Sequence, residues 1–104
     1  MLVADVLKSC KDTLERHYGA SLKGVILFGS MARNQGGPGS DIDLLVLLDG
    51  PFDFFGELRQ IIDLLYPIQL ESDRLISAKP ASKTDYEQGR IRLYRNAKRD
   101  GLPV

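Results

Sequence analysis

The sequence predicts a small α/β (α+β) domain in which a mixed sheet of three or four strands has helices packed mainly on one face. Two short apolar runs, at residues 25–28 and 42–48, end in glycine or in an Asp-Gly-Pro turn, as buried strands commonly do. The segments around them carry apolar residues at three- and four-residue steps, which is the spacing of amphipathic helices. The 104 residues suit one domain, which we expect to span 1–104.

The first expected helix covers residues 2–18, where one face is apolar and the other is charged, and Gly19 follows as its C-cap. It holds the one cysteine and the one histidine of the chain: Cys10 lies on the apolar face, and His17 is a half-exposed position. With a single residue of each kind, the sequence excludes a disulfide framework within the chain and a Cys/His zinc site. A hydrolase of the Ser-His or Cys-His type would have to use His17, and we do not expect one.

The first strand is expected at residues 25–28, and Gly29 ends it. Residues 30–33 can form one short helical turn. Residues 34–40 contain three glycines and one proline, a composition that predicts a loop. The second strand is expected at residues 42–48, and an Asp-Gly-Pro turn closes it.

The second half of the chain predicts a helix from residue 52 or 53 to 66, which Pro67 is expected to stop. Residues 68–77 alternate in polarity and predict a strand with one wet face. A last helix is expected over 83–99, with Ser82 as its N-cap and an acidic residue three positions later. The order of elements favours a parallel second and third strand with a right-handed crossover, and an antiparallel first pair.

The composition excludes several broad classes of protein. Fourteen basic residues balance 14 acidic ones, so nothing global indicates a nucleic-acid or membrane partner. The last expected helix has a local excess of basic residues, for which a solvated face is favoured over a nucleic-acid or partner contact. No apolar run approaches the ~18 residues of a membrane span, and we expect a cytoplasmic protein with no membrane partner.

Two acids stand at the start of the second strand. Asp41 and Asp43 are two residues apart, so in an extended chain their side chains leave the same face of the sheet. Side by side they repel each other unless a cation lies between them, and a hard divalent ion, above all Mg²⁺, is the natural compensation. Antiparallel pairing would put Gly29 and Ser30 beside them, where backbone N–H groups at the start of a helical turn can hold a phosphate.

The stretch "FGSMAR…SDIDLLV" resembles the signature of the DNA polymerase β-like nucleotidyltransferase superfamily, in which Gly-Ser is followed, after a loop, by Asp-x-Asp at the start of a strand. The shortness of the chain and its C-terminal "RNAKRDGLPV" are similar to the stand-alone minimal nucleotidyltransferases (MNT proteins). The resemblance implies a polymerase β-like nucleotidyltransferase core. The positions that match the family's phosphate- or nucleotide-binding residues are Gly29, Ser30, Arg33 and Ser40. The positions that match its metal-binding and catalytic residues are Asp41 and Asp43.

The family usually adds a third carboxylate from a neighbouring strand. Asp73 is the candidate for this metal-binding and catalytic position, because a parallel third strand would bring it near the other two acids, and Glu71 is its rival. The sequence departs from the family pattern in two places. Asn34 stands where the family often has glycine, and the third strand lacks a clean apolar-Asp-apolar pattern.

The resemblance also implies an activity, in which two Mg²⁺ ions assist transfer of a nucleoside monophosphate, AMP from ATP above all, to a hydroxyl group. Stand-alone members are commonly paired with a HEPN-domain protein as the antitoxin of a toxin–antitoxin module, and some add AMP to a tyrosine of the toxin. Two other functions stay open: a nucleotidyltransferase-like module that neutralises a partner by docking, and a simple metal- or phosphate-binding domain. The NTP, the acceptor and the homo- or hetero-oligomeric state are also open.

Overall fold

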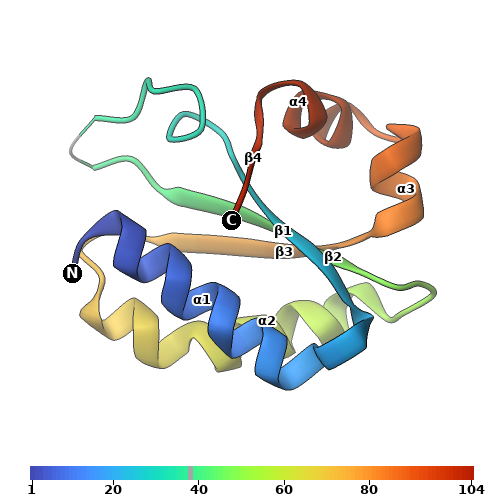
Figure 1. The fold of residues 1–104 in the computed structure, drawn as a ribbon, viewed down its shortest axis with the longest axis horizontal. Coiled ribbons are helices and arrows are strands. Elements are labelled where there is room, and N and C mark those ends of the chain that lie inside the picture. The colour runs from blue at the N-terminus through green and yellow to red at the C-terminus, as the bar shows by residue number, and fades with distance from the viewer. Residues whose placement is uncertain (38) are drawn as a thin grey trace.

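The helices and strands follow one another in an order close to the predicted one, in a computed structural model that describes residues 1–37 and 39–104 (Figure 1). The long elements are helices α1 (Val3–Tyr18) and α2 (Phe54–Glu71) and strands β1 (Leu22–Phe28), β2 (Ile42–Leu48) and β3 (Ile76–Ser82). The short elements are a 3-10 turn η1 (Gly19–Ser21), helices α3 (Lys83–Gln88) and α4 (Arg92–Asp100), and strand β4 (Leu102–Pro103). The predicted second strand coincides with β2.

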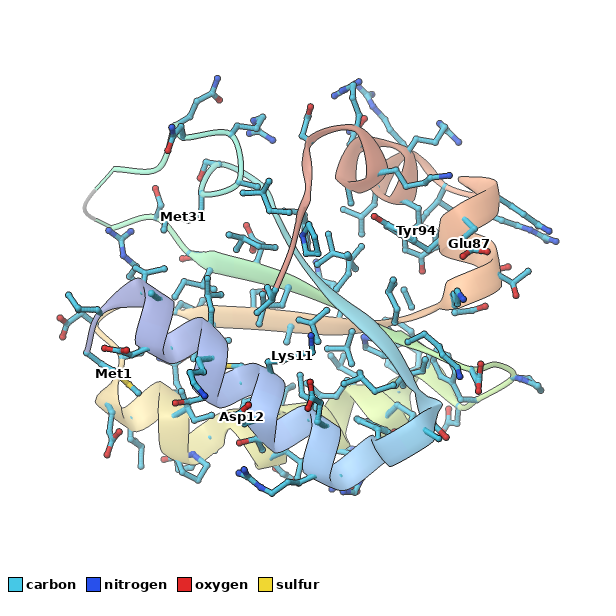
Figure 2. The ribbon with its side chains drawn as sticks, in the orientation of Figure 1. Met1, Lys11, Asp12, Met31, Glu87 and Tyr94 are labelled. Atoms are coloured by element: carbon cyan, nitrogen blue, oxygen red, sulfur yellow. The ribbon has the colours of Figure 1, made fainter. Side chains whose placement is uncertain are left out.

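The strands form one sheet in the order β3-β2-β1-β4. The two predicted pairings are confirmed, since β1 and β2 are antiparallel and β2 and β3 are parallel. The sheet has four strands, within the predicted three or four; the fourth, β4, pairs antiparallel with β1, and its position was not predicted. From α1, Lys11 (Figure 2) donates to the carbonyl oxygen of Val104 at 2.6 Å, which fastens the segment that includes β4.

Helices cover both faces of the sheet. Figure 1 shows α1 and α2 below the sheet and α3 and α4 above it. In β2, Leu44 and Val46 join the larger apolar cluster with α1 and α2, whereas Leu45 and Leu47 join a smaller cluster with Ala97 of α4. The two long helices therefore share one face, as predicted, and the short pair closes part of the other. Within the described residues, no helix has the length and apolar character needed to cross a membrane.

Helix α2 continues through Pro67, so the predicted stop at that residue and the predicted strand at 68–77 are wrong. Ile61 and Leu65 are buried, and Ile68 packs against the same cluster, so the helical spacing of apolar residues runs across the proline. A proline inside a helix removes one backbone hydrogen bond, and this packing offsets the loss. As a result, β3 begins only after the turn that ends α2.

The helix predicted at 83–99 is divided into α3 and α4. Gly89 has a φ of 62°, in the left-handed region that glycine adopts readily, and its N–H bonds to carbonyl groups at the end of α3. The chain can therefore turn before α4 starts, and Ala97 comes to lie on the sheet. The predicted N-cap is confirmed, because the Oγ of Ser82 accepts the N–H of Asp85 at 3.3 Å.

Candidate active site

The two acids predicted at the start of the second strand lie on the face of the sheet opposite α1 and α2. Asp43 pairs with Phe28 in β1 and with Ser77 in β3. Because side chains alternate along a strand, Asp43 shares its face with Leu45, which packs in the α4 cluster. Asp41 comes one residue before β2, is exposed, and acts electrostatically on the partly buried Asp43. The structure thus brings the two carboxylates together.

The electrostatic balance at Asp43 favours a bound cation. Burial raises the pKa of Asp43, the neighbouring negative charge of Asp41 raises it further, and the ammonium of Lys79 lowers it. Two adjacent carboxylates that offer only oxygen donors form a ligand set suited to a hard divalent cation. The side chains of Asp41 and Asp43 therefore fit a Mg²⁺ ion.

Gly29 brings the end of β1 directly against this pair. Its φ is 76°, and a Cβ atom added there would overlap the Oδ2 atom of Asp43. Only a residue without a side chain lets the backbone come this close in this conformation. The predicted juxtaposition of Gly29 with the acids is therefore found, and it depends on the absence of a side chain.

The chain after Gly29 forms the predicted short turn. The N–H of Arg33 donates to the carbonyl oxygens of Gly29 at 3.3 Å and of Ser30 at 3.2 Å, and the N–H of Gln35 donates to Ser30 at 2.9 Å. The turn has the polarity of a helix start, whose first N–H groups have no earlier carbonyl to bond. Arg33 borders a cavity of about 210 Å³ together with Gly29 and with Asp100 of α4.

The loop between this turn and Asp41 is tied to the turn before β3 by Arg74, which the sequence did not indicate. Nη1 of Arg74 donates to the carbonyl oxygens of Gly37 at 2.9 Å and Ser40 at 3.0 Å. It also lies 3.7 Å from Sδ of Met31, which is labelled in Figure 2. The Oγ of Ser40 also accepts the N–H of Gly37 at 2.8 Å. Ser40 thus holds the loop that leads into Asp41. An arginine before a strand has no distinguishing pattern, so no signal in the sequence identifies Arg74.

The third carboxylate is not brought to the pair. Glu71 is the last residue of α2, and Asp73 lies in the following turn, where it borders a cavity with the start of α1. Among the residues that the structure describes, no group of three or more His, Cys, Asp or Glu side chains could hold a metal ion. The prediction of Asp73, with Glu71 as its rival, assumed a strand at 68–77, which is helix and turn here.

Comparisons with known proteins identify the family of the chain. Residues 7–95 match the family model described as a nucleotidyltransferase domain. The chain is 32% identical over 92 residues to "Putative protein adenylyltransferase MJ0604" of Methanocaldococcus jannaschii, an alignment that covers 82% of this chain and 92% of that protein. The fold is similar to the crystal structure of a "putative nucleotidyltransferase" from Sulfolobus solfataricus, with a TM-score of 0.60 and 19% identity over 96% of this chain and 79% of that one. The chain, with its Asp41–Asp43 pair beside Gly29, therefore belongs to the nucleotidyltransferase domain family.

Proposed function

We propose that residues 1–104 act as one nucleotidyltransferase domain that transfers a nucleoside monophosphate, AMP from ATP above all, to a hydroxyl group. The observation that carries this proposal is the contact between Gly29 and the carboxylate of Asp43, with Asp41 beside it. This contact supports a site in which a phosphate-binding turn and a metal-binding pair would lie together. The relative described as a protein adenylyltransferase supports AMP as the transferred group and a protein as the acceptor.

In this proposal, Asp41 and Asp43 hold Mg²⁺, which when bound would neutralise triphosphate charge and favour ionisation of the attacking hydroxyl. The family resemblance implies two ions, the first also held by Asp73 or Glu71. Because neither of these acids is brought to the pair, the present proposal concerns one ion at Asp41 and Asp43. The acceptor oxygen forms a bond to the α-phosphorus, the bond from the α-phosphorus to the bridging oxygen breaks, and pyrophosphate leaves. The proton of the hydroxyl passes to solvent.

In this proposal, the turn after β1 binds the phosphates that leave as pyrophosphate. The N–H groups of Gly29 and Ser30 and the hydroxyl of Ser30 bind the β- and γ-phosphates. Arg33 adds a charge-assisted contact at the rim of the same cavity. Since these groups are fixed before the substrate arrives, the chain contributes positioning and electrostatic stabilisation of the transition state.

The acceptor in this proposal is a hydroxyl on a partner protein, as in a toxin–antitoxin pair with a HEPN-domain toxin. A second candidate function needs no catalysis, namely neutralisation of the partner by docking. Helix α2, on the face of the sheet opposite the two acids, offers a surface for it, because Phe55 and Leu70 are 69% and 68% exposed. That alternative is favoured by the distance of Asp73 from the site, which leaves the carboxylate set one member short.

Incubation with ATP labelled at the α-phosphate, Mg²⁺ and the protein encoded beside this one separates the two functions. If the protein is a nucleotidyltransferase, we expect label on the partner. The label should be lost with EDTA and in the double variant Asp41→Asn/Asp43→Asn. A matched control is Asp5→Asn, which changes an exposed acid on α1. Neutralisation of the partner without label, and to the same extent by the double variant, would establish the docking module instead.

A further inference from the structure

Strand β3 brings a lysine, and no acid, to the face that carries Asp41 and Asp43. In the parallel register of β2 and β3, Asp43 is opposite Ser77 and Leu45 is opposite Lys79. Alternation along the strand puts Ser77 and Lys79 on the face of Asp43, because the intervening Ala78 packs in the cluster on the other face. Lys79 is therefore the charged residue that β3 adds beside the carboxylates.

The ammonium of Lys79 is in reach of the site and available to an anion. Its charge acts on Asp43, and its side chain is exposed. Among the described residues, Lys79 takes part in no salt bridge within 4.0 Å, while other lysines pair with nearby acids. Arg74, by contrast, is engaged with loop carbonyls, and Arg33 lines a cavity together with the carboxylate-bearing Asp100.

We propose that Lys79 binds the triphosphate of the nucleotide and supplies the positive charge that a second metal ion would otherwise bring. This inference rests on the proposed function. Three carboxylates with two Mg²⁺ ions carry a single net positive charge, and so do two carboxylates, one ammonium and one Mg²⁺. The site of this chain thus reaches the same charge balance with one ion, held by Asp41 and Asp43.

An ammonium and a metal ion differ in what they do for the substrate. A lysine is a compact point charge on a flexible stem, so it follows phosphate oxygens as the chain of phosphates moves. It cannot, however, coordinate two oxygens in a fixed geometry as Mg²⁺ does. Lys79 is therefore assigned to neutralising the phosphates, and orientation of the reacting groups stays with the ion at Asp41 and Asp43.

Binding measurements test the assignment without turnover. Mn²⁺ binding, followed by electron paramagnetic resonance, is measured with the ATP analogue that has a methylene bridge between the α- and β-phosphates. We expect one Mn²⁺ per wild-type chain and a loss of analogue affinity of roughly 10-fold or more in Lys79→Met. Lys79→Asp should allow a second Mn²⁺ to bind. The matched control Lys83→Met removes an exposed lysine at the start of α3 and should leave both values unchanged.

Each outcome has a defined meaning. Two Mn²⁺ ions per wild-type chain, or an analogue affinity of Lys79→Met within twofold of wild type, would overturn the role of Lys79 while the proposed function stands. Failure of wild-type protein to bind the analogue with Mn²⁺ would overturn the proposed function and the role of Lys79 together. Thermal unfolding of each variant shows that it is folded, as expected for substitutions at an exposed position.

Discussion

At the scale of single residues, the carboxylate of Asp43 that would bind a metal ion also destabilises the metal-free fold. Its pKa is raised in the folded protein, chiefly by burial and then by Asp41, so the ionised carboxylate destabilises the metal-free fold relative to its neutral form. This destabilisation is present above the folded pKa. It disappears below the unfolded value of about 4, where the carboxyl is neutral in both states.

We therefore expect Asp43→Asn to raise the Tm of the metal-free protein at pH 7, because the substitution removes a partly buried charge. The difference from wild type should shrink as the pH falls toward about 4. Thermal unfolding in EDTA across this pH range measures it, with Asp63→Asn as an exposed control. A lower Tm for Asp43→Asn at pH 7 would show that the ionised carboxylate stabilises the fold.

The second prediction at the residue scale concerns the close approach of Gly29 to Asp43. In Gly29→Ala, the new Cβ would meet the carboxylate of Asp43 at a φ of 76°, so the backbone or the carboxylate must move. Misplacement of about 1 Å costs on the order of 100-fold in rate, and we expect kcat/KM for nucleotidyl transfer to fall by at least about that factor. Gly37→Ala is the matched control, since no atom lies within 4 Å of a Cβ added there. Equal activity of the two variants would contradict the role of Gly29.

At the scale of elements, the turn between α2 and β3 is hydrogen-bonded to the loop that precedes Asp41. Side chains of Gln69 and Ser72 bind the backbone at Arg74, with Ser72 Oγ donating to its carbonyl at 2.8 Å. The guanidinium of Arg74 then binds Gly37 and Ser40. The end of α2 is thus connected to the residue immediately before Asp41.

We expect Arg74→Ala to weaken Mn²⁺ binding and to lower the transfer rate by roughly 10- to 100-fold, because the loop before Asp41 loses two hydrogen bonds to one charged group. Arg74→Lys can restore one of these bonds and should recover part of the metal affinity. Electron paramagnetic resonance gives the Mn²⁺ affinity, and thermal unfolding separates this effect from global destabilisation. Unchanged metal affinity in Arg74→Ala would limit Arg74 to a structural role.

The accuracy of the sequence predictions varied from element to element for physical reasons. Strand β2 was predicted to the residue because it is buried on both faces and reads as one apolar run. The predicted helix boundaries near Pro67 and Gly89 were wrong. Tertiary packing continues α2 through the proline, and Gly89, in the left-handed conformation, divides the last predicted helix into α3 and α4. The error at Pro67 placed the third strand too early, and the candidate Asp73 followed from that error. Strand β4 has only two residues, which carry no periodicity.

The basic excess of the last two helices also has an explanation at this scale. Nζ of Lys98 donates to the carbonyl oxygen of Glu87 at 2.6 Å, and Nη1 of Arg95 donates to that of Gly89 at 2.9 Å. Positive charges favour the C-terminal end of a helix, where carbonyl groups lack partners. Lys98 and Arg95 from α4 therefore cap the end of α3, which gives these two basic side chains a structural role.

For the whole molecule, the site lies where several elements meet: the end of β1, the start of β2 and the middle of β3. A ligand that binds there bridges segments that are far apart in the chain, and it binds the folded protein only. We expect Mg²⁺ with the methylene-bridged ATP analogue at about 100 times its Kd to stabilise the protein by about 2.7 kcal/mol, or to raise Tm by roughly 10 °C or more. Differential scanning fluorimetry measures this shift. EDTA, or the double variant Asp41→Asn/Asp43→Asn, should abolish it, and a shift that persists in both would place the nucleotide elsewhere.

The position of Asp41 and Asp43 on β2 also bears on how the chain finds its correct strand alignment. If β2 paired one residue out of step, every side chain would exchange faces, and the two acids would turn toward the apolar cluster beneath α1 and α2. Burial of unpaired carboxylates is costly, so such misaligned intermediates are selectively disfavoured. The pair of acids thus favours the correct register of β2 during folding, before any metal or nucleotide is present.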